Sequence, residues 1–453
     1  MAKNYRFLLS ALPAMGHINP TVGFGDLLKA RGHEIIFVQS EKFRKIAEDH
    51  GFEFVPFDDS IVGVDNVNQF IKWILENSQY FGSNWIERVK HLTEDDSKIF
   101  ASMFENTKKM NDALEKILNQ IGHIDCTVTD FIDVLPCLYN RKNLINIPLI
   151  SFNPIAIYPS GPGSFGGGFS LLKPDPTVWA EFQEGMKRLW SGTRKMRKEW
   201  LTSLGMEELA EKLDSGPFVP RPDHFGFYHY PEDLDYKELG ETEPGWMRID
   251  YCIREADPDE KFEVPKILQD KPGKLIYFSM GSLASCDLSM MRKILAILAK
   301  SPHRFIVSTG QLGDKLQLAD NMWGEPYVDQ LKVLQAVDMA IIHGGNNSVV
   351  ETFYYARPMA VIPYFFDQLD NAQRIEDLGL GKRIDFWSTG ESEFLKIIED
   401  TLTNTEVHEK IQKISENMRS STSREKAAKM IEDLIENQNE FKNRNILIED
   451  GKK

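Results

Sequence analysis

The sequence predicts an α/β protein with two doubly wound parallel sheets. Short apolar runs of strand length alternate with helical patterns, the order expected when helices connect neighbouring parallel strands. The alternation occurs twice, once before residue 156 and again after residue 270, with a stretch over 156–247 that is rich in proline and glycine. A length of 453 residues fits this division, because a domain holds roughly 150 residues.

The first series begins with RFLLSAL (6–12), a buried-strand pattern that is followed by the signals of a helix start. Asn19 can cap this helix, Pro20 suits its first position and Gly32 ends it, which leaves His17 in the loop after the strand. A signal peptide would also begin with a basic residue and a short apolar run, but the strand is the better interpretation. The other expected elements are strands at 33–39, 127–130 and 147–152 and helices at 20–31 and 133–142.

Two further regions differ from this alternation. Residues 66–122 are helical in pattern and rich in aromatic side chains, which predicts a helical excursion over the first sheet that could wall a pocket. Residues 156–247 are predicted to form irregular surface and linker.

The second series repeats the alternation with a regular spacing. Its expected strands are 274–279, 303–309, 338–343 and 359–363, and its expected helices are 287–300, 329–337, 348–356 and 368–379, followed by charged amphipathic helices after Glu391. Ligands of doubly wound sheets bind beyond the carboxyl ends of the strands, so two such sheets in tandem are expected to face each other across a cleft.

Composition excludes several classes of function. The net charge of -15 and the pI near 5.3 argue against a nucleic-acid groove, which needs accumulated Lys and Arg. No window approaches the 18 apolar residues of a membrane span. The four cysteines lack metal-site or disulfide spacing, as in a reducing compartment. We therefore expect a cytoplasmic protein.

Two turns in the second series are suited to binding phosphate. HGGNNS (343–348) lies between a strand and a helix, where free backbone N–H groups and the helix dipole favour an anion. Gly281 and Ser282 follow another strand in the same way. Either turn alone would more often serve only to reverse the chain or cap a helix, but the two together predict a site for a diphosphate.

The stretch HGGNNSVVETFYYARPMAVIPYFFDQLDNAQ resembles the donor-binding signature of the UDP-glycosyltransferases. PAMGHINP (13–20) is similar to the family loop that bears the catalytic histidine. The resemblance implies a GT-B fold, in which two Rossmann-like domains face a central cleft. It implies an acceptor-binding domain at 1–245, a UDP-sugar-binding domain at 246–420, and a helix within 421–453 that crosses back to the N-terminal domain.

The same resemblance implies roles for residues of the C-terminal half. His343 would meet the α-phosphate, Glu351 the ribose diol, and Asp367 and Gln368 the hydroxyls of the sugar. The diphosphate would be held by Gly281, Ser282, Gly345, Asn347 and Ser348. Glutamine at position 368 is associated with glucose in plant members of the family.

One segment departs from the family pattern. Where the family commonly has Trp-x-Pro-Gln, with the indole stacked on uracil, this chain has Tyr327, Val328, Asp329 and Gln330. Tyrosine still offers an aromatic face and Gln330 can still bond the base edge. The nucleoside of the donor could therefore be thymidine or carry another base instead of being uridine.

A transferase of this kind needs a base to deprotonate the acceptor hydroxyl, and the resemblance places His17 in that role. Its partner carboxylate would be Asp130, at the end of the strand CTVTD, where it would fix the imidazole tautomer. Asp125 and Asp133 are weaker candidates, and Asp130 as a helix cap is a competing interpretation. The implied mechanism inverts the anomeric centre and needs neither metal nor cofactor.

Aromatic residues of the N-terminal half are candidates for the acceptor pocket, although most helical aromatics fill cores. The candidates are Phe81, Trp85, Phe104 and Phe165. The motif GPGSFG (161–166) satisfies a dinucleotide-binding pattern, but the prolines that follow deny it the required helix. We interpret it as a loop over the acceptor.

The expected function is transfer of a sugar, preferably glucose from UDP-glucose, to a small hydroxylated apolar acceptor such as a flavonoid, in detoxification or secondary metabolism. The protein is expected to act as a monomer. Two alternatives stay open: a UDP-sugar epimerase of the same fold, and a non-catalytic nucleotide-sugar-binding subunit. A dinucleotide oxidoreductase is disfavoured.

Overall fold

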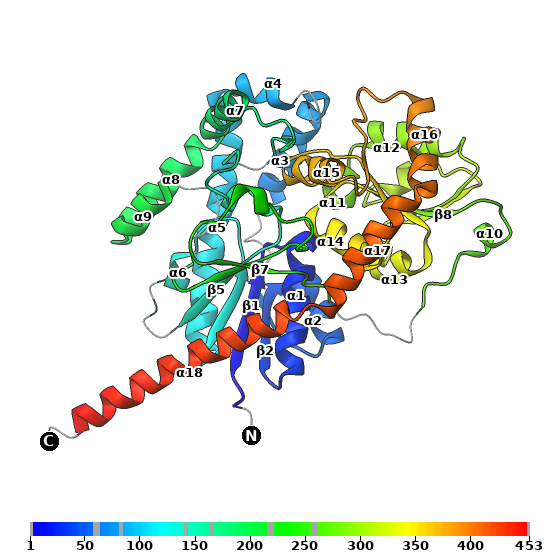
Figure 1. The fold of residues 1–453 in the computed structure, drawn as a ribbon. Coiled ribbons are helices and arrows are strands. Elements are labelled where there is room, and N and C mark those ends of the chain that lie inside the picture. Colours follow the sequence, from blue (N-terminus) through cyan, green and yellow to red (C-terminus); the bar gives the residue numbers. More distant parts are fainter. Residues whose placement is uncertain are drawn as a thin grey trace.

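The computed structural model contains two α/β domains packed side by side (Figure 1). It describes residues 3–57, 64–80, 85–139, 141, 144–163, 166–214, 222–254 and 261–450. Each domain is built on one parallel sheet, with seven strands in the N-terminal sheet and six in the C-terminal sheet of the described chain. The predicted α/β class with two parallel sheets is confirmed.

The N-terminal sheet has the strand order β3-β2-β1-β4-β5-β6-β7, so β1 lies at its centre between β2 and β4. Phe7 of β1 pairs with Ile35 of β2 and with Cys126 of β4, and all three are buried, as expected of a sheet covered on both faces. Its strands are β1 (Arg6–Ala11), β2 (Glu34–Ser40), β3 (Glu53–Phe57), β4 (Cys126–Asp130), β5 (Ile145–Ile150), β6 (Gly226–His229) and β7 (Trp246–Ile249).

The helix after β1 starts earlier than predicted. α1 spans Met15–Ala30, and the carbonyl of Ala14 accepts the N–H groups of His17 and Ile18 at 2.9 and 3.0 Å. Pro20 therefore lies inside the helix, where it removes only one hydrogen bond, instead of at the first position. The correction matters for function, because His17 is held on the first turn of α1 and not on a loop.

The other helices of the N-terminal domain cover both faces of its sheet and extend above it (Figure 1). They are α2 (Arg44–Asp49), α3 (Val64–Asn77), α4 (Trp85–Lys90), α5 (Glu94–Gln120), α6 (Pro136–Tyr139), α7 (Pro176–Leu189), α8 (Ser191–Ser203) and α9 (Glu207–Asp214). α3 to α5 form the predicted helical excursion.

The prediction of irregular surface over 156–247 is wrong for much of that region. It holds α7 to α9, β6 and the start of β7. The start of α7 could have been predicted from the sequence. Asp175 caps the helix by accepting the N–H groups of Thr177 and Val178, and Pro176 lies in the first turn. β7 also carries the N-terminal sheet to Ile249, beyond the predicted limit of the domain at residue 245.

The C-terminal sheet has the order β10-β9-β8-β11-β12-β13, with β8 and β11 adjacent at its centre. Its strands are β8 (Leu275–Ser279), β9 (Arg304–Ser308), β10 (Met322–Glu325), β11 (Met339–Ile342), β12 (Met359–Val361) and β13 (Lys382–Arg383). Its helices are α10 (Lys266–Gln269), α11 (Gly281–Ala284), α12 (Leu288–Leu298), α13 (Gln330–Ala336), α14 (Asn346–Tyr354), α15 (Asp367–Asp377), α16 (Glu391–Thr403) and α17 (Thr405–Ser420).

The last helix, α18 (Ser423–Asp450), runs back across the N-terminal domain (red in Figure 1). The guanidinium of Arg31, the residue after α1, donates to both carboxylate oxygens of Glu432 on α18, at 2.6 and 2.8 Å. His33 Nε2 lies 3.1 Å from the same carboxylate. Among the described residues, no helix combines the length and the apolar character needed to cross a membrane.

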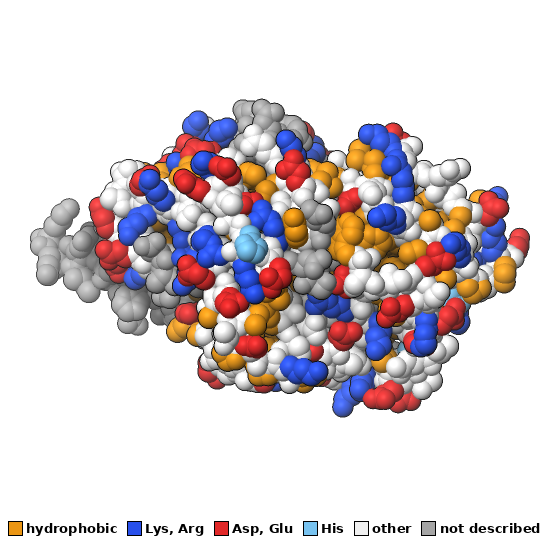
Figure 2. Space-filling view, turned by 90° about the horizontal axis from the view of Figure 1, so that it is seen from above, with side chains coloured by type: hydrophobic (Ala, Val, Ile, Leu, Met, Phe, Trp, Pro, Cys, Tyr) orange, Lys and Arg blue, Asp and Glu red, His pale blue; other side chains and the backbone are white. Residues whose placement is uncertain are grey.

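The two domains share a hydrophobic core. One continuous cluster of buried side chains includes Ile150 and Tyr230 from the N-terminal domain and Val349 and Phe353 from α14 of the C-terminal domain. α1, which carries His17, also packs against α14. Side chains of both charges are interspersed on the face of the molecule shown in Figure 2.

Candidate active site

The catalytic pair predicted from the sequence is assembled at the carboxyl end of the N-terminal sheet. β1 and β4 are adjacent, and Ala11 at the end of β1 pairs with Asp130 at the end of β4. His17 Nδ1 lies 3.0 Å from Asp130 Oδ1. The Asp130 side chain is 1% exposed and the His17 ring 18% exposed. A buried carboxylate facing Nδ1 favours the tautomer with its proton there, which leaves Nε2 as the basic nitrogen.

Ser151 completes this pair and was missed by the sequence reasoning. It follows β5, its hydroxyl donates to Asp130 Oδ2, and its Oγ lies 3.0 Å from His17 Nδ1. The Asp130 carboxylate is thus engaged by both His17 and Ser151. The only sequence signal for Ser151 was its position at the end of a buried strand, which is too general to select it.

The environment of His17 raises its pKa. Burial opposes the charged ring and is the largest single influence, but the Asp130 carboxylate outweighs it through charge and hydrogen bonding. Asp367, from the C-terminal domain, raises the pKa further. His17 therefore lies within electrostatic reach of a residue that was predicted to bind the donor sugar, across the boundary between the domains.

The turn between β11 and α14 has the shape predicted for an anion site. Gly345 precedes the first residue of α14, so the free N–H groups of the helix start at this turn. The side-chain amide nitrogen of Asn347 and Nδ1 of His343 are buried and have no hydrogen-bond partner among the described residues. Buried polar groups are rarely left unpaired, so these two atoms are open to a ligand.

His343 is packed between the two glycine turns. A Cβ atom added to Gly281 or to Gly345 would lie 2.7 or 2.5 Å from the His343 ring. Gly281 also has a φ of 66°, a conformation that side chains disfavour. Burial lowers the pKa of His343 to about 4, against a hydrogen bond to the Ser279 backbone. The ring is therefore neutral at pH 7 and meets an anion as a dipole, not as a charge.

A network of polar side chains lies behind this turn, where the ribose was expected. Gln330 Nε2 donates to Glu351 at 2.5 Å and to Ser348 Oγ at 3.2 Å. Tyr277 donates its hydroxyl to Gln330 Oε1 at 3.2 Å. The structure thus directs Ser348 towards Gln330 and Glu351. Ser282 lies in the short helix α11, at the turn that follows β8.

Glu351 is 3% exposed, and its pKa is raised to about 7 by burial, with Arg254 and the Gln330 hydrogen bond acting in the opposite direction. Its ionisation is therefore finely balanced at neutral pH. A carboxylate at this position can accept hydrogen bonds from two hydroxyls, as the predicted ribose contact requires.

Arg254 is a second residue that the sequence reasoning missed. It comes from the segment after β7, and its Nη2 donates to the Tyr327 hydroxyl at 3.2 Å and lies 3.6 Å from Asp329 Oδ1. Tyr327 and Asp329 are two of the departures from the family pattern, so one cation contacts both. The Tyr327 side chain is 56% exposed, which leaves its ring face accessible to a base. No motif marks Arg254.

Asp367 and Gln368 start α15 next to the domain boundary. Asp367 Oδ2 accepts the N–H of Asn153 at 3.1 Å, and burial raises the Asp367 pKa to about 6. Gln368 Oε1 accepts the N–H groups of Tyr364 and Phe365, at 3.0 and 3.3 Å. The Gln368 oxygen is thus used to shape the preceding turn, and its amide N–H groups are the part suited to a sugar hydroxyl.

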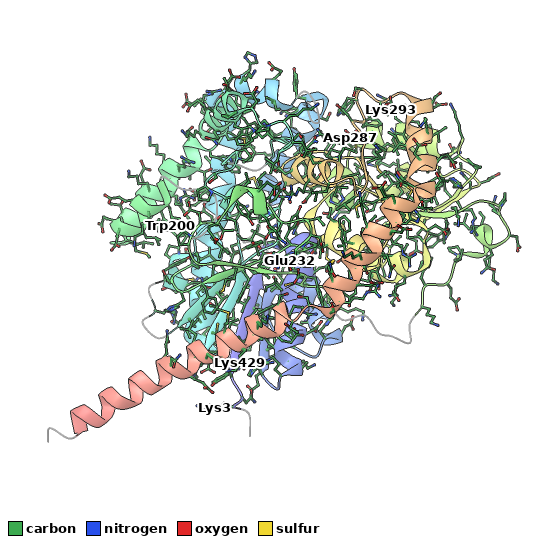
Figure 3. The ribbon with its side chains drawn as sticks, viewed as in Figure 1. Lys3, Trp200, Glu232, Asp287, Lys293 and Lys429 are labelled. Atoms are coloured by element: carbon green, nitrogen blue, oxygen red, sulfur yellow. The ribbon has the colours of Figure 1, made fainter. Side chains whose placement is uncertain are left out.

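Of the four aromatic residues predicted to line the acceptor pocket, the structure describes the side chain of Phe104 alone. Phe104 is 2% exposed and packs edge-on against Trp200 of α8, with ring centroids 5.7 Å apart (Trp200 is labelled in Figure 3). It is a core residue between α5 and α8, and the acceptor assignment is corrected accordingly. Phe81 and Phe165 lie outside the described residues, as does the side chain of Trp85, which begins α4.

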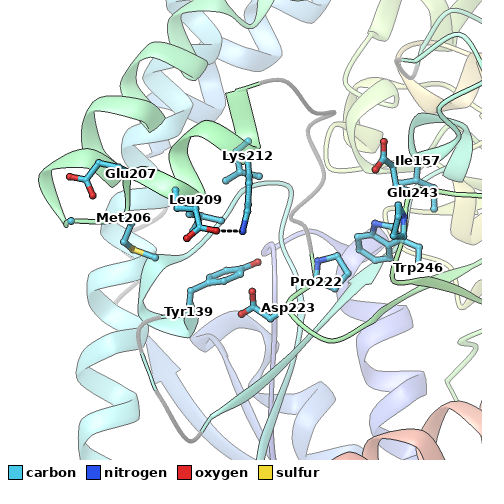
Figure 4. A pocket seen from close by; sticks show the side chains of 14 residues that line it. Tyr139, Ile157, Met206, Glu207, Leu209, Lys212, Pro222, Asp223, Glu243 and Trp246 are labelled. Atoms are coloured by element: carbon cyan, nitrogen blue, oxygen red, sulfur yellow. Dashed lines mark hydrogen bonds and ion pairs between the residues drawn. The ribbon is translucent and has the colours of Figure 1, made fainter.

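Two surface cavities of the N-terminal domain lie away from this site. One, of about 740 Å³, is bordered by Tyr139, Lys212 and Trp246 (Figure 4). The other, of about 880 Å³, is bordered by Trp73, Arg88 and Asp96. His17 and the donor-turn residues line neither. In the described part of the chain, no group of three or more His, Cys, Asp or Glu side chains could hold a metal ion.

The sequence of this chain is similar to those of known glycosyltransferases. Residues 262–421, which include both glycine turns and α15, match the family model described as UDP-glucoronosyl and UDP-glucosyl transferase. The chain is 22% identical over 436 residues to the NDP-glycosyltransferase YjiC of Bacillus subtilis (strain 168), a match that covers 95% of this chain and 97% of YjiC. Residues 262–421 thus carry the UDP-glycosyltransferase domain, and YjiC matches this chain over almost its whole length.

Two further comparisons extend this result. The chain is 24% identical over 405 residues to the sterol 3-beta-glucosyltransferase of Saccharomyces cerevisiae (strain YJM789), a match that covers 84% of this chain and 31% of that protein. Its fold matches the solved structure of the glycotransferase of kitacinnamycin with a TM-score of 0.67 and 19% identity, over 97% of this chain and 100% of the other. The chain thus has the predicted GT-B fold and is an enzyme of the hexosyltransferase class.

Proposed function

We propose that this UDP-glycosyltransferase transfers glucose from UDP-glucose to a hydroxyl of a small apolar acceptor, such as a flavonoid or another phenol, with inversion at the anomeric carbon. The observation that carries the proposal is the position of the His17–Asp130 pair. It lies on one domain and within electrostatic reach of Asp367 on the other, where the donor turn of α14 also lies.

The chemical step begins with proton removal from the acceptor. His17 Nε2 takes the proton of the acceptor hydroxyl, and Asp130 stabilises the imidazolium that results. The acceptor oxygen forms a bond to the anomeric carbon as the bond from that carbon to the diphosphate oxygen breaks. One displacement from the face opposite the leaving group inverts the configuration. Ser151 helps to keep Asp130 aimed at Nδ1 of His17.

The leaving diphosphate gains negative charge as the bond breaks. The start of α14 provides backbone N–H groups and the positive end of the helix dipole, and the amide of Asn347 adds a side-chain donor. His343 lies beside them and donates from Nδ1 only in the tautomer that carries its proton there. Groups fixed in place before the reaction stabilise this charge without reorganising during it. Gly281 and Gly345 leave room for the His343 ring between the two turns, and Ser282 offers a hydroxyl donor from the other turn.

Asp367 and Gln368 support a hexose with several free hydroxyls, because a carboxylate and an amide can together accept and donate hydrogen bonds. The yeast relative named above is a glucosyltransferase that acts on sterols, which supports both a glucosyl donor and an apolar hydroxylated acceptor. The name NDP-glycosyltransferase for YjiC supports testing bases other than uracil.

The test offers the protein UDP-glucose, UDP-galactose, UDP-glucuronate and TDP-glucose, each with a panel of phenols and sterols, and reads the products by mass. A mass gain of one hexose on an acceptor, greatest with UDP-glucose, is the expected result. Conversion of the UDP-sugar without an acceptor would indicate the epimerase instead. UDP binding without turnover on any acceptor would indicate a non-catalytic subunit.

A further inference from the structure

Helix α15 is bound along its length by the N-terminal domain. Asn371 accepts the side-chain N–H of Asn153 at 2.7 Å, next to the bond between Asp367 and the Asn153 backbone. Arg374 donates to the carbonyls of Leu234 and Asp235 at 2.7 and 2.6 Å. The helix that begins with the candidate sugar-binding residues is therefore placed by contacts from both domains.

The end of the glycine-rich stretch makes a different contact with this helix. Asp370 is 3% exposed, and its two carboxylate oxygens accept the N–H groups of Gly166 at 2.5 Å and of Gly168 at 2.8 Å. Both glycines have positive φ, at 98° and 60°. A Cβ on Gly166 would lie 3.0 Å from the Phe366 Cα, and one on Gly168 would lie 3.0 Å from the Leu369 Cβ. Only glycine allows this close approach.

The contact falls on a strained part of the backbone. Phe366 has a φ of 49°, a left-handed conformation that a bulky side chain adopts only where its surroundings enforce it. It is the residue before Asp367, and so it sets the direction in which the Asp367 carboxylate leaves the chain. The segment that lies against the Phe366 backbone belongs to the other domain.

We propose that Gly166 and Gly168, bound by Asp370, form an interdomain clasp that holds the Phe366 turn and orients Asp367 towards the donor sugar. Asp370 is then a positioning residue that determines sugar preference and helps to exclude water from the anomeric carbon. The clasp rests on the proposed function, since it deepens the role of Asp367 in it. Its loss would allow water to accept the glycosyl group in place of the acceptor hydroxyl, giving UDP and free sugar.

Asp377 provides a matched control for a role of Asp370 that is limited to holding the two domains together. Asp377, at the other end of α15, accepts hydrogen bonds from Ser170 Oγ and the Leu171 N–H at 2.8 and 2.9 Å. Its two bonds to the N-terminal domain resemble those of Asp370 in number and length, but they lie ten residues after Asp367. A role limited to holding the domains together predicts equal effects for the two aspartates.

The test compares Asp370→Ala, Asp370→Asn and Gly166→Ala with Asp377→Asn. For each variant, transfer rates from UDP-glucose and UDP-galactose, the fraction of donor hydrolysed and the affinity for UDP are measured. We expect the first three variants to lower the preference between the two sugars about tenfold, as loss of an oriented polar contact does, and to raise hydrolysis relative to transfer. UDP affinity should stay within about twofold, because the diphosphate turn is separate.

Unchanged sugar preference and unchanged hydrolysis in folded Asp370→Asn or Gly166→Ala would overturn the clasp, as would equal changes in Asp377→Asn. Thermal melting checks folding, and Gly166→Ala provides the test if Asp370→Ala does not fold. Failure of the proposed function is distinct, because the unaltered enzyme would then transfer no sugar from any donor.

Discussion

At the scale of single residues, the proposed function depends on two ionisable groups, His17 and Glu351, whose pKa values are set by burial and by neighbouring polar and charged side chains. Asp130 raises the pKa of His17 in spite of burial, and Arg254 lowers the pKa of Glu351 against burial. Each pair gives a pH dependence of known sign.

The first dependence concerns His17, which must be neutral to accept a proton. Because its pKa is raised above 6.5, kcat/KM should fall as the pH drops through this raised value. In Asp130→Asn the pKa should fall, so the acid limb of the profile should move to lower pH while the maximum rate drops by a factor of about 10² to 10⁴. Initial rates between pH 5 and 9, with buffers in this range chosen for constant ionic strength, would check this. An unmoved acid limb would show that another group titrates.

The second dependence concerns Glu351, which must be ionised to accept two ribose hydroxyls. Its pKa of about 7 means that the affinity for UDP should rise as the pH increases through neutrality. Arg254→Met removes a cation that lowers this pKa, so the rise should move to higher pH, and Arg254→Lys should move it least. Calorimetric titration with UDP at several pH values measures the shift. The same pH dependence in Arg254→Met and the unaltered protein would contradict it.

At the scale of elements, the turn after β8 and the start of α14 depend on glycine. In Gly281→Ala the new methyl group would meet the His343 ring at 2.7 Å, on a backbone with a φ of 66°. We expect a loss of about 1–3 kcal/mol in the free energy of unfolding, together with weaker UDP binding, because the ring must move. Denaturant unfolding and UDP titration check the two effects. Gly390→Ala is the control, since a Cβ there meets nothing within 4 Å.

The helices and strands also show how much of the fold could be predicted from the sequence. The strands at the centre of each sheet were predicted because they are continuous apolar runs bounded by turns, as in β1 and β8. The short strands β6, β7 and β10 were missed, because four residues carry too little pattern to separate a strand from a loop. The helix α1 was predicted, but its start was placed at Pro20 because proline is common at the first position of a helix. In the structure the helix starts at Met15, and Pro20 lies inside it.

The candidate site shows the same limit. His17 and the residues of the donor turn could be named because they lie in motifs that are contiguous in the chain, and Asp130 because the family resemblance expects a carboxylate at the end of its strand. Ser151 and Arg254 could not, because each acquires its partners only when distant segments meet. Phe104 was misassigned since an aromatic helical residue looks the same in a core and in a pocket. The roles themselves stay predictions until they are measured.

At the scale of the whole molecule, α18 ties the end of the chain to the N-terminal domain. Glu432 accepts two hydrogen bonds from Arg31, which lower its pKa, and lies beside His33. Glu432→Gln should lower the free energy of unfolding by about 1–3 kcal/mol, the range for a hydrogen-bonded charge. Asp433→Asn, in an exposed pair with Lys429 on the same helix, should change it little. Equal effects of both changes on chemical unfolding would argue against the docking role of Glu432.

The arrangement of the two domains carries the central claim that His17 of one domain acts on a sugar held by the other. It is tested most directly by the single-turnover rate of glucose transfer at saturating UDP-glucose, in the unaltered protein and in His17→Ala. The account predicts a β-linked glucoside from the unaltered protein, and in His17→Ala a rate lower by a factor of about 10² to 10⁴ with UDP binding intact. Transfer by His17→Ala at the rate of the unaltered protein, or an α-linked product, would contradict it.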